Sequence, residues 1–409
     1  MALDYRARGL SSGPEELFDK VEPPFQVTGQ HTITADQNRP SSDRFEIRPR
    51  GGQAVRVELV LKSRARRPMK NRWMEIAILL AVVPRVISAT DRRTLGEIDF
   101  FGYKGLDVAA IRSALPFHEG DLFPPPKVHA DELKRQVSQT VEKVIGRPAT
   151  DVAFICCDSK QNAMVYIGLP GDSYSPLTFN PAPTQNVRFP KAALALREEL
   201  DKALENAVMK GHATEDDSEG YTLTNEPKAR KAQLAIREYA LHNEALILQV
   251  LASSADAWHR AVAAQMLGYA RQSDEQVDAL VRASLDSDDG VRNDAVRALE
   301  VLAGAKPDLA KRIPPEPFVR LLRSGVWLDH NKASLVLLAL TNSRDPKLLM
   351  LLRTDGLDSL IEMARWRSPG HAEAALTILG RMAGLSEDSL SKLIEAGQAD
   401  TIVSKFNPR

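Results

Sequence analysis

One apolar pattern returns four times in the C-terminal part of the chain, and it constrains the fold more than any other feature. Intervals of 32, 39 and 41 residues separate the leucines of this pattern, which are Leu267, Leu299, Leu338 and Leu379. Such intervals are typical of helix pairs that stack on one another, because a single pair cannot bury its own apolar face. The pattern therefore predicts a row of helical repeats over residues 234–409.

A small residue precedes each of these leucines by one helical turn. These residues are Ala263, Ala295, Ser334 and Ala375. A small side chain at this place lets a neighbouring helix approach closely. An earlier apolar segment accompanies each copy and is expected to form the first helix of the pair. These segments are residues 245–251, 275–285, 317–322 and 357–366.

The turn inside the second copy reads Asp-Ser-Asp-Asp-Gly-Val-Arg and ends at Arg292. With Ala295 and Leu299 after it, this turn resembles the HEAT-repeat consensus, in which an Asp-rich turn leads to Val-Arg and then to Ala-x-x-Ala-Leu. The resemblance implies an α-solenoid of the HEAT or armadillo type, with an Asp that caps the second helix and an Arg that joins neighbouring repeats. The first copy keeps Arg260, but the third has Asn331 in that place and the fourth also lacks the Arg. Whether polar contacts join the later repeats is therefore open, whereas the prediction of a solenoid is unaffected.

A different pattern, β-α-α-β-β, occupies residues 94–170. A strand is expected at 97–103, and Asp107 is placed to cap a helix that runs to Leu115. Residues 130–145 predict a second amphipathic helix, which Gly146 ends. Two β-rich runs follow around a short turn, at residues 151–157 and 163–169. The expected fold class is therefore multidomain and mostly α, with a small α+β domain before the helical repeats.

The order of these elements and the segment LPFHEGDLF, from Leu115 to Phe123, resemble the POTRA domain of bacterial outer-membrane assembly proteins. In that family a hydrophobic-x-x-Gly-Asp turn separates the two helices, and Gly120 and Asp121 stand in that place here. The resemblance implies binding of a peptide or partner strand at a sheet edge. The alternative is a generic two-layer α+β domain without a ligand.

The segment from Met69 to Ala89 has the order of a secretory signal peptide: basic residues, a short apolar run and small residues at the exit. The apolar run is shorter than the roughly 20 residues that a membrane-spanning helix needs. Residues 1–68 have little periodicity apart from a strand-like run at 55–61, and are expected to be disordered or an over-extended start before Met69. This interpretation predicts a periplasmic or secreted protein with a signal cleaved near Ala89. The alternative is a cytoplasmic protein with a disordered tail and a buried or anchoring helix.

Residues 171–233 are expected to link the two folded regions. The stretch 171–190 is rich in proline and predicts a stiff, irregular connector. A strong helix is expected at 191–210, followed by a solvated acidic loop at 211–227.

The composition excludes few functions. Lys plus Arg number 54 and Asp plus Glu also number 54, so no global charge attracts nucleic acid or an anionic membrane. The two cysteines, Cys156 and Cys157, are expected to be free thiols that are buried or half-buried, with a vicinal redox pair as the alternative. Neither acidic cluster has the spacing of a calcium-binding loop, and no zinc spacing is present. The sequence thus predicts no metal and no cofactor.

No catalytic motif is found in the sequence, so the chain is interpreted as a binding protein and not an enzyme. Side chains near the expected turns are the candidates for partner contacts, although buried packing is the favoured interpretation for the tryptophans. These candidates are Trp258, Arg260, Arg292, Trp327 and Trp366.

Three functions remain open. The first is an exported, envelope-associated scaffold that binds an unidentified protein partner through the solenoid surface. The second is a chaperone-like or assembly factor for outer-membrane polypeptides, which rests on the POTRA resemblance. The third is a cytoplasmic HEAT-like lyase or regulatory subunit.

Overall fold

The computed structural model describes residues 25–26, 42–49, 55–60, 93–124, 128–158 and 160–406, with the backbone alone in the first three ranges. The chain divides into two units, of which Tyr5–Arg72 is the smaller. This unit contains an antiparallel sheet of order β1-β2-β3, formed by β1 (Phe25–Gln26), β2 (Ser42–Pro49) and β3 (Val55–Val60). The strand β3 coincides with the strand-like run, whereas β1 and β2 were not expected. The signal-like segment 69–89 lies outside the described residues.

The larger unit begins with a mixed sheet of order β5-β4-β7-β6, in which β4 and β7 are parallel and the other neighbours are antiparallel. The predicted order β-α-α-β-β is confirmed, with the two-residue strand β5 added between the helices. The elements are β4 (Arg93–Phe101), α1 (Val108–Ala114), β5 (Leu122–Phe123), α2 (Ala130–Ile145), β6 (Asp151–Cys156) and β7 (Ala163–Gly168).

Local sequence explains where α1 and α2 begin and end. The Asp107 carboxylate accepts a hydrogen bond from the Ala110 N–H and caps α1 as expected. Helix α2 ends at Gly146, which adopts the left-handed conformation with φ +74° that glycine tolerates best. Leu133, Val137 and Val141 form the buried stripe of α2. These residues were predicted because they recur at helical spacing.

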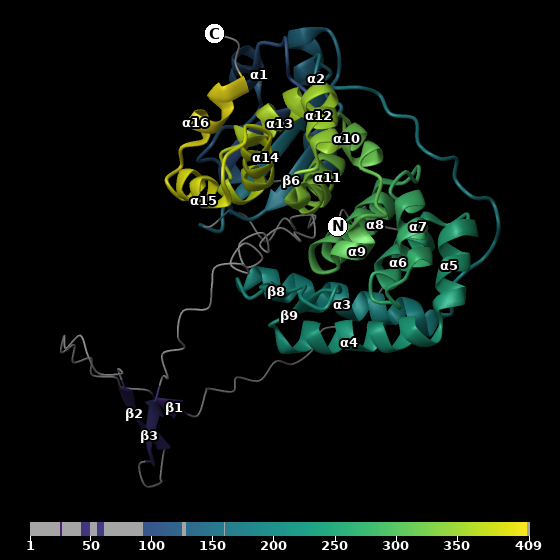
Figure 1. The fold of residues 1–409 in the computed structure, drawn as a ribbon. Coiled ribbons are helices and arrows are strands. Elements are labelled where there is room, and N and C mark those ends of the chain that lie inside the picture. Colours follow the sequence, from purple (N-terminus) through teal and green to yellow (C-terminus); the bar gives the residue numbers. More distant parts are fainter. Residues whose placement is uncertain are drawn as a thin grey trace. The chain divides into compact units, whose positions relative to one another are not determined.

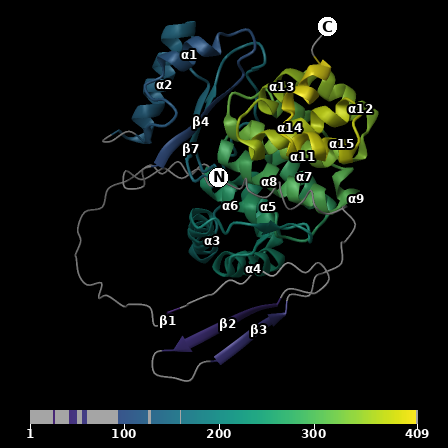
Figure 2. The same ribbon diagram turned by 90° about the vertical axis from the view of Figure 1, so that its left-hand side faces the viewer.

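The sheet is covered on both faces. Alternate side chains such as Ile98 and Phe100 pack against α1 and α2, whereas Phe101 and Tyr166 on the opposite face belong to the core of the helical part. Figure 2 shows α1 and α2 on one side of β4 and β7, and α13 and α14 on the other. The predicted α+β region is therefore packed against the helices and shares their core.

Helices account for most of the chain after residue 190 (Figure 1). A short hairpin of β8 (Glu215–Asp216) and β9 (Leu223–Thr224) interrupts them. The helices are α3 (Lys191–Met209), α4 (Pro227–His242), α5 (Glu244–Ser253), α6 (Ala257–Leu267), α7 (Asp274–Ala283), α8 (Asp289–Ala305), α9 (Pro307–Ala310), α10 (Glu316–Leu321), α11 (Trp327–Leu340), α12 (Pro346–Leu351), α13 (Leu357–Ala364), α14 (Pro369–Met382), α15 (Glu387–Glu395) and α16 (Ala399–Val403).

Four successive helix pairs correspond to the four copies of the sequence pattern. They are the first pair α5–α6, the second pair α7–α8, the third pair α10–α11 and the fourth pair α13–α14. The second helices form a continuous row, because α6 packs on α8, α8 on α11 and α11 on α14. Within the described residues, no helix is long and apolar enough to cross a membrane.

The alignment of the third copy is corrected by one residue. In the other pairs the small residue and the leucine lie seven and eleven positions after the residue that caps the second helix. Counted from Val326, which precedes α11, these places belong to Ala333 and Leu337, and both side chains are fully buried. Ser334 and Leu338 were wrong choices, because runs of neighbouring apolar residues hide the register of a helix that is buried on most of its surface.

Candidate functional site

The turns inside the four helix pairs form one row, here called the turn row: residues 254–256, 284–288, 322–326 and 365–368. Three of the four turns share a local design. The side chain two residues before the helix cap accepts the N–H of the cap residue: Ser254 from Asp256, Asp286 from Asp288, and Ser324 from Val326. Asp256 and Asp288 then cap α6 and α8 by accepting backbone N–H groups of the first turn.

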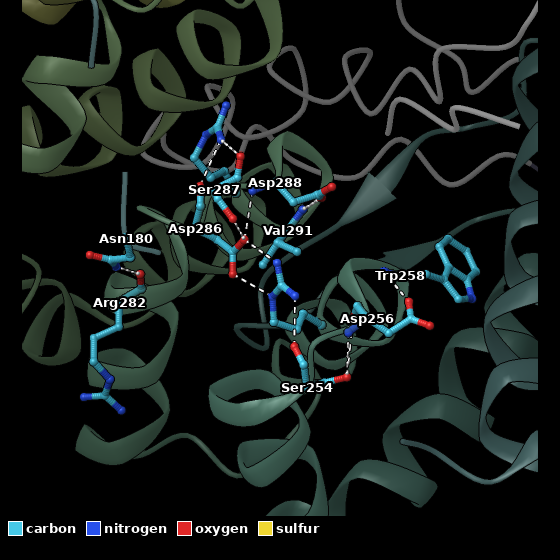
Figure 3. A network of polar contacts seen from close by, with 11 residues as sticks. Asn180, Ser254, Asp256, Trp258, Arg282, Asp286, Ser287, Asp288 and Val291 are labelled. Atoms are coloured by element: carbon cyan, nitrogen blue, oxygen red, sulfur yellow. Dashed lines mark hydrogen bonds and ion pairs between the residues drawn. The ribbon is translucent and has the colours of Figure 1, made fainter. Parts of the chain in front are cut away.

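A buried polar ladder joins the first three turns. Arg260 donates to the Ser254 carbonyl at 2.9 Å and to both carboxylate oxygens of Asp286 in the next turn at 2.8 Å. Arg292 repeats this arrangement with the Asp286 carbonyl and with the carboxylate of Asp329, at 2.9 Å in each case. His330 stands in the equivalent place of the third pair, where its Nε2 contacts the Ser324 carbonyl. Figure 3 shows the part of this network around Ser254, Asp286 and Asp288.

The proline-rich connector 171–190, here called the strap, runs along the turn row. Three of its backbone N–H groups, spaced five residues apart, each donate to a carbonyl in one turn or directly before it. Ser175 bonds the Arg323 carbonyl at 2.8 Å, Asn180 the Leu285 carbonyl at 2.7 Å, and Gln185 the Ser253 carbonyl at 3.1 Å. The three carbonyls are equivalent, since each lies three residues before the cap of a second helix. The strap therefore binds one turn of each of the first three pairs.

Prolines help to hold the strap extended. Pro176 and Pro181 directly follow two of the bonding residues and disfavour helical backbone there. Phe179 of the strap lies 3.8 Å from the Arg292 guanidinium and covers the ladder. The irregular connector was predicted, but its contacts with the turns were not. The only sequence signal for these contacts was that Pro176 and Pro181 lie five residues apart, each directly after a bonding residue.

The fourth turn is held by the sheet. The Trp366 indole N–H donates to the Phe100 carbonyl at 2.9 Å, and the Arg367 N–H donates to the Asp99 carboxylate at 2.9 Å. The Glu362 carboxylate at the end of α13 accepts the backbone N–H groups that follow β4, from Gly102, Tyr103 and Lys104, and the hydroxyl of Ser173. The outer edge of β4 is thus closed by side chains.

The structure places four of the five predicted contact residues in the interior. Arg260 and Arg292 are held in the ladder, and Trp327 and Trp366 pack around Tyr166 at ring-centre distances of 5.1 and 5.0 Å. The prediction is therefore corrected for Arg260 and Arg292, which are ladder residues and not partner contacts. Trp327 and Trp366 have the buried packing that was favoured for the tryptophans. Trp258 is half-buried beneath the Arg197 guanidinium. Sequence reasoning did not see this, because an arginine in a turn has the same local pattern whether its carboxylate partner lies in the same protein or in another.

A partly enclosed cavity of about 60 Å³ lies among α3, the β8–β9 hairpin, α4, α6, α8 and α11. Its wall contains Glu215, whose carboxylate accepts two bonds from Arg297 at 2.6 Å. On the opposite side Arg197 donates to Asp294 at 2.9 Å. Glu215 was expected in a solvated loop and is buried instead, because the hairpin carries it to α8.

Burial perturbs the charged groups near this cavity. Desolvation and the Asp217 carboxylate raise the pKa of Glu300 to about 7. Desolvation and the Arg297 guanidinium lower the pKa of Lys332 to about 8. Both groups therefore change charge near neutral pH, although each belongs to a class that is ordinarily charged there. The sequence carried no signal for this cluster.

A second depression lies on the row of first helices. It is an open groove of about 550 Å³ between α7 and the segment 311–316, lined by Val281, Ile313 and the two prolines that follow, with charged side chains around them. The charged residues are Asp278, Arg282, Lys311, Arg312 and Glu316. Arg312 crosses toward α7 and pairs with Asp274 at 3.0 Å.

Two further expectations meet the structure here. Cys157 is half-buried and disulfide-bonded, so the expectation of a free thiol is wrong for this residue. Across residues 93–124, 128–158 and 160–406, no three His, Cys, Asp or Glu side chains are arranged to hold a metal ion.

The geometry of these sites stands without support from relatives. No protein-family model matches the chain, and a search of curated proteins finds no significant match.

Proposed function

We propose that this chain is a polypeptide-binding scaffold of the HEAT type, which binds its partner on the row of first helices α5, α7, α10 and α13. The observation that carries this proposal is the open groove between α7 and the segment 311–316, whose lining combines a few apolar side chains with charges of both signs. Grooves of this kind suit an extended segment of a partner, because apolar contacts supply affinity and the surrounding charges fix orientation.

The HEAT assignment is supported by the turn row. Asp256 and Asp288 cap second helices, and Arg260 and Arg292 each join one pair to the next, as the sequence resemblance implies. In the third pair His330 stands in the place of the arginine and contacts the Ser324 carbonyl. In the fourth pair Ala372 stands there, and contacts with the sheet hold the turn instead of the ladder. An irregular series of four helix pairs thus accounts for the helical part.

The chain's own segments cover much of the other surfaces of the helix pairs. The strap occupies the turn row, α3 and the hairpin lie over α6 and α8, and the sheet lies on α11 and α14. A partner that binds those surfaces has to displace parts of the chain. The groove on the first helices needs no such displacement, and it is therefore the proposed contact.

Position-specific crosslinking in the native organism tests this contact. A photoreactive residue at Arg282 or Glu316, on the two sides of the groove, should form an adduct with one and the same protein. The control position is Arg135, which is exposed on α2. Adducts of equal yield from Arg135, or none from either groove position, would contradict the proposal.

Charge reversal sharpens the same test. The double variant Arg282→Glu with Lys311→Glu should lower recovery of the crosslinked protein about tenfold, since like charges then face the partner. The matched control is Arg135→Glu with Lys143→Glu on α2, which makes the same change in net charge. Unchanged recovery by the groove variant would place the contact elsewhere.

The export of the protein is a separate part of the proposal. It rests on the signal-like order of residues 69–89 in the sequence. Sequencing of the mature N-terminus from the native organism tests it: a first residue just after Ala89 supports export, and one before Met69 contradicts it.

A second candidate function is strand addition to the sheet, as the POTRA resemblance implies. The observation that favours it is the difference between the two sheet edges. Trp366 and Arg367, in the turn between α13 and α14, close the edge of β4, whereas no strand among the described residues pairs with the outer edge of β6. Recovery of barrel-assembly proteins by a photoreactive residue at Ala153, but not at Arg282, would favour this candidate over the first.

A further inference from the structure

The cavity among α3, the β8–β9 hairpin, α6, α8 and α11 contains hydrogen-bond acceptors that have no donor. The Asn293 side chain is only 3% exposed, and its Nδ2 donates to Asp294 at 3.0 Å, which fixes the amide orientation. Its Oδ1 is buried and accepts no hydrogen bond. The same holds for Oε1 of Gln265, which lines the cavity from α6. A buried acceptor without a donor is costly, so the occupant of this cavity has to donate hydrogen bonds.

The charge around the cavity favours a cation. Arg297 pairs with Glu215, and Arg197 pairs with both Asp201 and Asp294. Beyond these groups, the carboxyl groups of Asp217 and Glu300 act on the same cluster, against the ammonium group of Lys332 and the guanidinium of Arg237, which lies over the Tyr221 ring. The balance is negative when all of these groups are ionised.

The size of the cavity and the rest of its lining fit a ligand larger than a single bare ion. A volume of about 60 Å³ exceeds the roughly 10–15 Å³ that one water or small ion occupies on this measure. Leu200, Leu204 and Val301 supply an apolar wall, and Tyr269 supplies an aromatic ring. Tyr221 also lines the cavity, with the Arg237 guanidinium over its ring at 3.8 Å. Aromatic faces and buried acceptors together are suited to an ammonium group that carries a short apolar chain.

We propose that this cavity binds a small organic ammonium ion, whose N–H groups donate to Asn293 Oδ1 and Gln265 Oε1 while its carbon chain lies against the leucines of α3. This site lies outside the groove of the proposed function, so either proposal stands or falls without the other.

Calorimetry on the full chain with butylammonium chloride tests the site. The measurement is made at pH 8, where Glu300 is mostly ionised. Butanol and butyrate share the chain length but lack the ammonium group, and should bind at least about tenfold more weakly. Ammonium chloride tests the ion without its chain and should also bind more weakly. Equal binding of butanol or butyrate, or no binding of butylammonium at millimolar concentration, would overturn the proposal.

Two variants and one control place the binding in this cavity. Gln265→Met and Asn293→Leu each remove one acceptor, and each should weaken butylammonium binding about tenfold. The control variant is Gln272→Met. Gln272 lies in the loop after α6, outside the cavity wall, and its side chain donates to the Glu219 carbonyl. It should bind like the unmodified chain.

The variant Lys332→Gln gives an effect of opposite sign. It removes a competing positive charge and should strengthen butylammonium binding several-fold. Damage to the fold cannot produce tighter binding, so this result separates a true cation site from loss of structure. Tighter binding of butyrate than of butylammonium to the unmodified chain, or unaltered binding by all three cavity variants, contradicts the assignment.

Discussion

The turn before α8 and the turn before α14 occupy equivalent places in two helix pairs, yet different chemistry holds them. At the turn before α8, Asp286 accepts the N–H of the cap residue Asp288, Arg292 bridges to Asp329, and the strap donates one N–H to the Leu285 carbonyl. At the turn before α14 the equivalent residues are Trp366 and Ala372, and the contacts come from β4. The same helix-pair geometry therefore accepts either a polar ladder or an aromatic contact with a sheet.

This difference has a physical basis. A buried arginine needs a carboxylate and carbonyl groups close by, and the first three pairs supply them at each step. The fourth pair faces the apolar side of the sheet, where Tyr166 packs between Trp327 and Trp366. A charged side chain at Ala372, which is buried there, would lose its hydration without gaining a partner.

The largest effect is expected when the ladder is broken. Arg292→Ala leaves the Asp329 carboxylate buried with only Ser324 as a side-chain donor, and should lower the free energy of unfolding by about 3–5 kcal/mol. Denaturant unfolding measures the change. The control Arg282→Ala removes an exposed arginine of α7 and should cost less than about 0.5 kcal/mol. Similar losses in the two variants would show that the ladder is not the main support of this turn.

Two buried groups, His330 of the third pair and Glu362 of the fourth pair, should respond to pH with opposite signs. Burial lowers the pKa of His330 from 6.5 to about 4, so the folded chain binds fewer protons than the unfolded chain in that window and loses stability as pH falls through it. Burial raises the pKa of Glu362 from 4.5 to about 7, so the folded chain binds more protons there and loses stability as pH rises through it.

Unfolding curves between pH 4 and 8 test this contrast. Each group contributes a slope of at most about 1.4 kcal/mol per pH unit. The variant His330→Gln should lose one slope and Glu362→Gln the other. Slopes of the same sign for the two residues would contradict the expected difference between these two groups.

The strap contacts should be smaller. Gln185→Pro removes the N–H that donates to Ser253 and should cost about 1–3 kcal/mol. Asn186→Pro instead places a proline directly after Gln185, as prolines already follow Ser175 and Asn180. This variant should be neutral or stabilising by up to about 1 kcal/mol. Thermal unfolding of both variants is the measurement. If Gln185→Pro is as stable as Asn186→Pro, the strap does not hold the turn row.

The smallest effect is expected at a single cap. Ser254→Ala removes the acceptor for the Asp256 N–H and should cost about 1 kcal/mol, the usual value for such a cap. Chemical denaturation measures it, with Ser253→Ala, one residue earlier, as the control. A loss above that of Arg292→Ala would reverse the ranking of ladder and cap.

Much of the local structure could be predicted from the sequence. Helix α2 was placed at both ends, and the first helices of all four pairs were found, because helical spacing and capping residues act within a few positions of the chain. The register of α11 was missed by one residue, since the helix is apolar around most of its surface. Even for α11, the local pattern correctly predicted a helix, and only the register of its buried positions was wrong.

The candidate sites could not be predicted in this way. Arg197 meets Asp294 across 97 residues of sequence, and Glu215 meets Arg297 across 82. No local pattern records such a pairing, and Glu215 was expected in a solvated loop. The strap had a weak signal in its prolines, but its partners were visible only once the turns lay in a row.

The sequence by itself determined that the chain contains a β-α-α-β-β region and four helix pairs, because periodicity, caps and turns depend on neighbours in the chain. Only the tertiary structure decided which surfaces are free. It buried the arginines and tryptophans that looked like contacts, laid the strap along the turns and closed one edge of the sheet. Burial depends on what packs from elsewhere in the chain, and that is a property of the whole fold.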